Sequence, residues 1–196
     1  MKIKYFSLLI GLLFIQLSYA DINKTVLPES GLIEWKLVDN NFELKLVQRL
    51  PDQTRSFFEG RGFSKTITRN IANSCVFQTI GRNNSKDKNQ TIHVSLKTWF
   101  IKINQQRQPI KLKEAWDKEW NEEQVKPASR IAFRWATFPT EQSFEPSGDY
   151  NWGMISFGPQ PGSVFDLYVE WKNNDQKKSA WIKNITCPVN RKPANR

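Results

Sequence analysis

Few of the side chains that bind copper, those of histidine, cysteine and methionine, occur in this sequence. His93 is its one histidine, and Met154 is the one methionine besides Met1. Imidazole and thioether groups are both copper ligands, so a mononuclear copper site from His93 and Met154 stays open if folding brings them together. The sequence has no HExxH, Walker A or GxGxxG motif. We therefore expect no cofactor and keep copper handling as an alternative.

Acid–base chemistry would have to come from the stretch "FRWATFPTEQSFEPSGDYNWGM", residues 133–154, which contains Glu141, Glu145 and Asp149. A retaining glycosidase holds two carboxyl groups about 5 Å apart, and an inverting one about 6.5–9.5 Å apart. Close spacing in a proline-containing loop establishes neither arrangement. A Ser-His-Asp triad would have to use His93, which has no recognisable nucleophile turn beside it. We expect a non-catalytic protein, with an enzyme as a weak alternative.

The same stretch is rich in aromatic rings, and two interpretations stay open. It could be a long loop pinned onto the fold by its aromatics, or a recognition surface that suits a sugar, a peptide or a partner protein. Phe133 and Trp135 alternate in a strand-like run, residues 128–138, so we expect both to be buried. The candidate binding surface comprises Gln142, Phe144, Glu145, Asp149, Tyr150, Asn151 and Trp152.

The N-terminal segment, residues 1–20, predicts export. Lys2 and Lys4 precede an apolar run of about 13 residues, too short to span a bilayer, and Ser18-Tyr19-Ala20 is typical of a cleavage site. We expect cleavage after Ala20 and a periplasmic or secreted protein. Nothing downstream is apolar enough to predict a transmembrane segment.

Export also predicts the state of the two cysteines, Cys75 and Cys187. In an oxidising compartment an even number of cysteines favours a disulfide, and no Cys-x-x-Cys redox motif is present. A pair of metal-ligating cysteines is the alternative. We expect a Cys75–Cys187 bridge that closes a loop of more than a hundred residues.

The charge of the chain limits its partners. Loss of Lys2 and Lys4 with the signal segment takes the formal net charge from +10 to +8. Basic proteins often bind nucleic acid, but export makes that partner unexpected. An anionic envelope surface or an acidic partner protein fits better, unless the charge serves only solubility. The tail, residues 191–196, is basic and predicted to be disordered.

Hydrophobic periodicity predicts short strands with helices between them. Strand patterns fall at 32–39, 42–49, 75–81, 91–103, 153–158, 163–172 and 178–186, and helical patterns at 51–60, 64–74 and 112–124. In the last helix Trp116 and Trp120 are four residues apart and should be buried together. Run 128–138 is ambiguous, and we favour a strand there. The sequence therefore predicts a mainly β fold, an antiparallel, immunoglobulin-like β-sandwich with helical insertions, as one domain over 21–190.

Three features together resemble a group of small exported bacterial proteins of uncharacterised function. They are "NSCVFQTIGRN" at 73–83, "RIAFRWATFPTEQSFEPSGDYNWGM" at 130–154 and the cysteine near the C-terminus. The resemblance covers most of the mature chain and carries no catalytic motif. It implies location and fold, and no activity.

These observations predict an exported, non-catalytic periplasmic binding or accessory module. Its expected partner is an envelope protein or a glycan. A carbohydrate-binding module would use Trp152, Tyr150 and Asp149, and would need exposed, coplanar rings on one surface. A copper-handling protein would need His93 close to Met154, and an enzyme would need a pocket with converging carboxylates.

Overall fold

The computed structural model describes residues 20–121 and 124–191. The predicted signal segment up to Tyr19 and residues 192–196 of the predicted tail lie outside the described residues. Arg191, the first residue of that tail, donates a hydrogen bond to the backbone carbonyl of Ser30.

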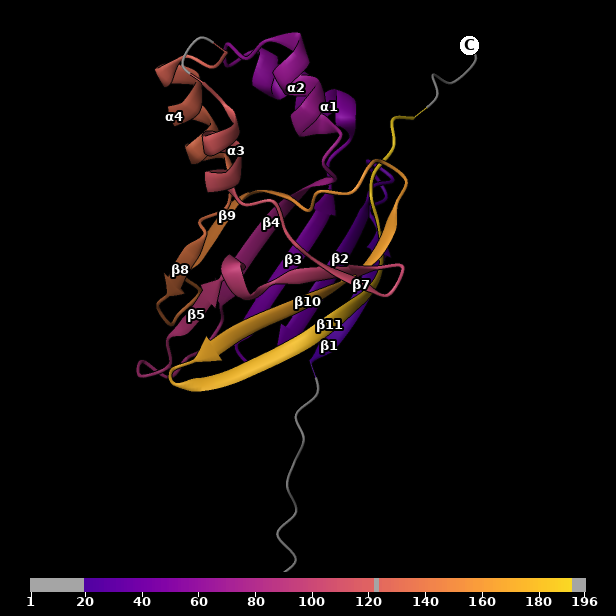
Figure 1. Cartoon of the computed structure of the whole chain (residues 1–196). Helices are drawn as coiled ribbons and strands as arrows, with labels where there is room; N and C mark the ends of the chain where they lie inside the picture. Colours follow the sequence, from indigo (N-terminus) through magenta and orange to yellow (C-terminus); the bar gives the residue numbers. More distant parts are fainter. Residues whose placement is uncertain (1–19, 122–123, 192–196) are drawn as a thin grey trace, which may run out of the picture.

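Two antiparallel sheets form the body of the protein (Figure 1). The first, sheet A, has the order β1-β2-β3-β4-β9. Its strands are β1 (Asp21–Val26), β2 (Ile33–Asp39), β3 (Phe42–Gln48), β4 (Val76–Asn83) and β9 (Tyr150–Ser156). A turn at Asn40-Asn41 joins β2 to β3, with Asn40 at a φ of 46°. Strand β1 was not predicted, because all six of its residues are exposed and carry no buried alternation.

The second sheet, sheet B, is organised around the long strand β10 (Val164–Asn173). Strand β11 (Gln176–Thr186) pairs with β10 along one side. The other side is shared by β5 (Ile92–Ser95) and β6 (Phe100–Ile103), which are two halves of one run interrupted by a 3₁₀ turn, Leu96–Thr98. Strand β8 (Glu141–Phe144) pairs with β5, and β7 (Gln106–Pro109) pairs with β6.

The main core lies between the two sheets. Side chains alternate between the faces of each strand, and the inward set of sheet A includes Trp35, Leu44 and Phe77. Leu167 and Trp171 contribute the matching face of β10. The predicted mainly β, sandwich-like architecture is confirmed. Trp35, Trp99 and Trp171 are buried within it.

The predicted disulfide is confirmed. Cys75 and Cys187 are bonded, with Cα atoms 5.1 Å apart and a sequence separation of 112 residues. Both residues are 1% exposed and belong to the main core. Cys75 immediately precedes β4 of sheet A, and Cys187 immediately follows β11 of sheet B. The bond therefore joins the two sheets directly.

Four helices form a second layer at one end of the sandwich, as Figure 1 shows: α1 (Pro51–Glu59), α2 (Lys65–Ala72), α3 (Lys113–Glu119) and α4 (Pro127–Ala136). They enclose a separate apolar core, in which the Phe133 ring packs on Phe58, Phe63, Trp116 and Trp120. Val76 and Met154 join it from sheet A, on the face opposite to Phe77 and Ile155. Within the described ranges no helix is long and apolar enough to cross a membrane.

The prediction of a strand over 128–138 is wrong, because this run forms most of helix α4. Pro127 occupies the first turn, where a missing N–H costs nothing. Ser129, Phe133 and Ala136, which are spaced by four and three residues, are all buried, so the helical period prevails over the alternation. Residues two apart on a helix point about 200° apart. Phe133 is accordingly 1% exposed, whereas Trp135, also expected to be buried, is 83% exposed.

Gly153 allows the chain to pass from the helical layer into the sandwich. The segment after α4 crosses β9 there, and the Phe138 amide donates to the Met154 carbonyl at 3.0 Å. A Cβ atom on Gly153 would meet the backbone nitrogen of Phe138 at 2.3 Å. Because that neighbour is backbone, it cannot swing away as a side-chain end can.

Gly153→Ala should therefore lower the free energy of unfolding by about 1–3 kcal/mol or more, through overpacking. Denaturant unfolding measures this loss. Gly60→Ala is the matched control, since its φ is −62° and its nearest neighbour to a new Cβ is at 3.4 Å. Equal midpoints for Gly153→Ala and the wild type would contradict the close approach.

Candidate functional site

The stretch 133–154 is an edge crossing between the two sheets and also a source of exposed aromatics. After α4 and the crossing segment, β8 joins sheet B, a turn follows at 145–149, and β9 joins sheet A. Phe144 was placed on the candidate binding surface, but it is 0% exposed and belongs to the main core. It anchors the end of β8 in the core rather than presenting a ring to solvent.

Most polar residues of the candidate surface hold the β8–β9 connection in place. The Asp149 carboxylate accepts a hydrogen bond from the Glu145 backbone amide at 2.9 Å. The Asn151 amide donates to the Gln142 side-chain oxygen at 2.8 Å, which links β9 to β8 and so joins the edges of the two sheets. The exposed side chain of Glu145 lies in the turn. Asp149, Asn151 and Gln142 therefore position the aromatics rather than forming a separate polar site.

A buried asparagine, Asn83, fixes the same β8–β9 connection against the end of β4. Asn83 is 0% exposed and closes β4. Its side-chain amide donates to the carbonyl oxygens of Phe144, at 3.1 Å, and Gln90, at 2.7 Å. Its backbone carbonyl accepts from the Gly148 amide at 2.8 Å. A buried amide whose hydrogen bonds are all satisfied specifies one arrangement of the strands around it. Asn83 therefore fixes the position of β9.

Two aromatic rings remain exposed on the outer face of β9. Tyr150 is 55% exposed and Trp152 is 56% exposed. They are two residues apart on one strand, so they share a face at a spacing of about 7 Å. On the neighbouring strand Ile80 pairs with Trp152 and Arg82 pairs with Tyr150. The Arg82 guanidinium carbon lies 5.1 Å from the centre of the Tyr150 ring, a cation–π contact.

The outer face of sheet A continues from these rings as a row of charged side chains. The strand register places Lys45 beside Ile80, and Lys36 beside Lys45. Glu43 is bound by Lys36 at 2.9 Å and lies 3.7 Å from Lys45. Burial works to raise the pKa of Glu43, but the hydrogen bond and charge of Lys36 outweigh it and lower that pKa below its usual value. The two exposed rings thus adjoin a flat polar surface with an excess of cations. We call Tyr150, Trp152, Ile80, Arg82 and Lys45 the β9 face.

The structure does not bring His93 and Met154 together. Met154 is 4% exposed and lies in the helical core. His93 is on β5 of sheet B, where its ring nitrogens contact Ser143 and Glu141. No group of three or more histidine, cysteine, aspartate or glutamate side chains capable of holding a metal ion occurs in the described part of the chain.

Sequence reasoning missed the polar network that includes His93. Ser143 Oγ lies 3.1 Å from His93 Nδ1, and Glu141 Oε2 lies 3.3 Å from His93 Nε2. Lys97 lies 3.0 Å from Glu141, and its hydrogen bond is the main cause that lowers the pKa of that carboxyl below its usual value. The signal in the sequence was the pairing of His93-x-Ser95 with Glu141-x-Ser143, but only the strand register shows that these pairs lie side by side.

The network contains a serine, a histidine and a carboxylate, as a catalytic triad does, but these groups are exposed and lie in no enclosed pocket. The side chains of His93 and Glu141 are 40% and 43% exposed. A shallow hollow of about 250 Å³ adjoins them, lined by His93, Ser95, Thr98, Glu141, Glu170, Trp171 and Lys172. Ser143 is not part of that lining. The carboxylate is already paired with a lysine, so the arrangement reads as a cross-strand network that stabilises the β5–β8 pair.

A second aromatic group, on the outer face of sheet B, differs from the β9 face. Phe100 and Tyr168 stack at 4.6 Å between ring centres, and Trp181 packs edge-on against both. The Arg107 guanidinium lies 3.6 Å from the centre of the Phe100 ring. The faces of the Phe100 ring are therefore occupied from within the protein. This group stabilises sheet B and offers less free ring surface than Trp152.

The comparisons with known proteins assign no family. No family model matches the chain, and neither the curated proteins nor the solved structures give a match.

Proposed function

We propose that the chain is an exported, non-catalytic binding module of the cell envelope that recognises a glycan on the β9 face. The observation that carries this proposal is the exposure of Tyr150 and Trp152, each more than half accessible, on one face of one strand. Large aromatic side chains are normally buried for the apolar area they remove from water. Two of them left in solvent on a rigid sheet mark a surface that binds something.

A glycan suits this surface better than the other ligand classes considered. The C–H face of a sugar ring is apolar and packs on an aromatic ring, while its hydroxyl groups bond to neighbouring polar side chains. The β9 face supplies the rings of Tyr150 and Trp152, with Arg82 and Lys45 beside them. It is a sheet surface rather than a deep pocket, which favours an extended chain over a small molecule.

The rival functions have less support. Copper handling requires His93 beside Met154, and these residues lie in different sheets and different environments. Catalysis by Glu141 and Asp149 is not supported by their contacts. Glu141 pairs with Lys97, and Asp149 accepts a hydrogen bond from the Glu145 amide across the turn between β8 and β9. Export is supported by the disulfide, which forms in oxidising compartments.

Trp152→Ala tests the proposal. The purified mature chain should bind at least one of peptidoglycan, chitin, cellulose or a uronic-acid polymer, and Trp152→Ala should weaken that binding about tenfold or more, the effect of losing one large aromatic contact. Its unfolding midpoint should stay close to that of the wild type, because the ring is exposed. Affinity electrophoresis and co-sedimentation measure the binding.

Trp135→Ala is the matched control, since it removes an equally large exposed ring from the helical layer. It should bind the same glycan as well as the wild type. If Trp152→Ala instead lowers stability and leaves every glycan interaction unchanged, stretch 133–154 is architectural and the proposal is wrong.

A further inference from the structure

Helix α4 is apolar on two opposite sides. Its inner side places Phe133 and Ala136 in the helical core. Its outer side exposes Pro127, Ala128, Ile131 and Trp135, with Ile131 at 55% and Trp135 at 83%. Pro127, Ile131 and Trp135 are spaced by four residues and form a single stripe. An exposed contiguous apolar stripe with a large aromatic ring is typical of an interaction surface, so this outer stripe is expected to have a partner.

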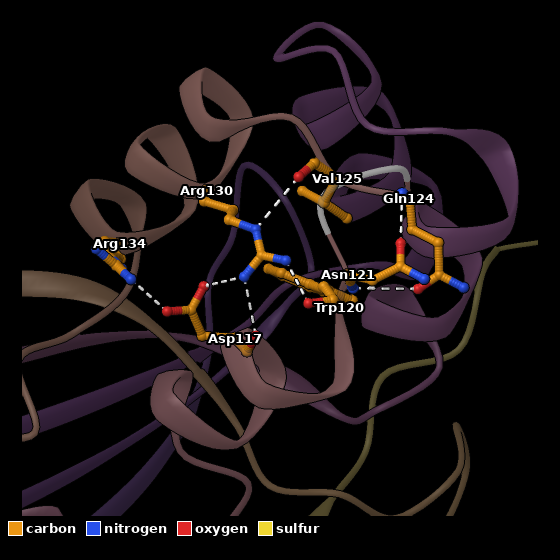
Figure 2. Close-up of polar contacts among 7 residues, drawn as sticks. All are labelled: Asp117, Trp120, Asn121, Gln124, Val125, Arg130 and Arg134. Atoms are coloured by element: carbon orange, nitrogen blue, oxygen red, sulfur yellow. Dashed lines mark hydrogen bonds and ion pairs between the residues drawn. The ribbon is translucent and has the colours of Figure 1, made fainter.

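The stripe is held rigidly in place. Arg130, on the same helix, donates hydrogen bonds to the carboxylate and the backbone carbonyl of Asp117, both at 2.9 Å, and to the carbonyl of Val125 at 3.2 Å. It also donates to the carbonyl of Trp120. Figure 2 shows this side chain spanning the α3–α4 connection, with Arg134 bound to the other carboxylate oxygen of Asp117. The outer side of α4 is thus presented by a fixed helical pair.

Cations flank the stripe. An open hollow of about 440 Å³ between α3 and α4 is lined by Lys113, Glu114, Asp117, Lys118 and Arg134. Both carboxylates in it are engaged: Glu114 accepts from the Thr140 hydroxyl at 2.7 Å, and the hydrogen bond from Arg134 is the main cause that lowers the pKa of Asp117. Among the described residues Lys113 and Lys118 form no ion pair. Arg134 lies three residues from Ile131, so this positive rim borders the apolar stripe.

An anionic bilayer surface fits this combination. Tryptophan prefers the headgroup level of a membrane, where its apolar ring and polar N–H are both satisfied. Basic residues beside a membrane are attracted by anionic lipids. The Trp135 ring stands clear of the protein, and a bilayer accommodates such a protruding ring without a matching groove, which a protein partner would have to supply.

We propose that the outer side of α4, with Ile131 and Trp135 inserted and Lys113, Lys118 and Arg134 over lipid phosphates, docks reversibly on membranes that contain anionic lipid. The surface is separate from the β9 face and does not depend on glycan recognition. One apolar stripe and three cations give weak association, strengthened by low salt. In an envelope, such docking would hold the β9 face near the membrane.

Vesicle co-sedimentation tests this proposal with the mature protein. The wild type should sediment with vesicles of phosphatidylcholine and phosphatidylglycerol, less with phosphatidylcholine alone, and less as salt increases. Trp135→Ala should weaken sedimentation about tenfold, and Lys118→Gln about fivefold. Trp152→Ala should sediment like the wild type. Membrane docking is thereby tested independently of glycan binding.

Three results would overturn the proposal. The first is no sedimentation with the anionic vesicles at low salt. The second is equal sedimentation of Trp135→Ala and the wild type, with both folded by circular dichroism. The third is a wild-type dimer, seen by light scattering, that Trp135→Ala converts to a monomer, because the stripe would then be covered by a second copy of the chain.

Discussion

The double variant Cys75→Ala/Cys187→Ala should lose about 4–5 kcal/mol of unfolding free energy. The bond closes a loop with a sequence separation of 112 residues, and the chain-entropy relation assigns a value of that size to such a loop. Domains are commonly stable by only about 5–15 kcal/mol, so the variant should lie close to unfolding at ambient temperature. Alanine is chosen because both positions are fully buried, where a serine hydroxyl would add a desolvation cost.

Guanidinium unfolding of the oxidised wild type, the reduced wild type and the double variant measures this effect. Reduction should reproduce the loss, since it removes the same constraint. The single variant Cys75→Ala should match the double variant, because Cys187 alone cannot form the bond. A double variant with the wild-type midpoint would show that the main core between the two sheets holds them together without the disulfide.

Trp120→Ala should cost about 3–5 kcal/mol, the range for removing a buried aromatic side chain. Trp120 is 6% exposed and packs on Phe133 at 4.9 Å and on Phe63 at 5.4 Å between ring centres. Its removal opens a cavity in a core that holds together all four helices. Denaturant unfolding followed by far-ultraviolet circular dichroism measures the loss.

Trp135→Ala is the internal control for this effect, because it removes the same side chain from the same helical layer. At 83% exposure its loss should change stability by no more than about 0.5 kcal/mol. Comparable losses for the two variants would mean that the outer side of α4 is packed in solution.

The contrast between these two tryptophans shows what the sequence could predict. In 112–124 the four-residue spacing predicted that Trp116 and Trp120 are buried together, and their burial is confirmed. The helix is shorter than predicted, because α3 ends at Glu119 and Trp120 enters the helical core from extended backbone, with φ −95° and ψ 130°. In 128–138 the hydrophobic pattern fitted both a strand and a helix. The prediction of a strand put Trp135 on the buried face together with Phe133, whereas the helix exposes it. Pro127 was the local signal for the start of a helix, but the decision came from the fit of Phe133 into the core shared with α1 and α3.

The candidate site was predicted in part, for a related reason. Tyr150 and Trp152 could be identified as candidate surface residues because a proline and a glycine mark the turn that precedes them. Phe144 was misplaced because β8 has only four residues, too few for its alternation to be read without knowing that it pairs with β5. The roles of Asn83 and Gly153 depend on contacts with residues distant in sequence, which no local pattern records.

Hydroxyl-radical footprinting during glycan binding would test the central claim most directly. Trp135, Trp152 and the half-buried Trp181 lie on three different surfaces, so each reports on its own surface within one sample. With solubilised peptidoglycan strands, or whichever polymer of the panel is bound, the account predicts that oxidation of Trp152 and Tyr150 falls while that of Trp135 and Trp181 is unchanged. Protection of Trp181 or Trp135 with Trp152 still oxidised at its free rate would contradict it.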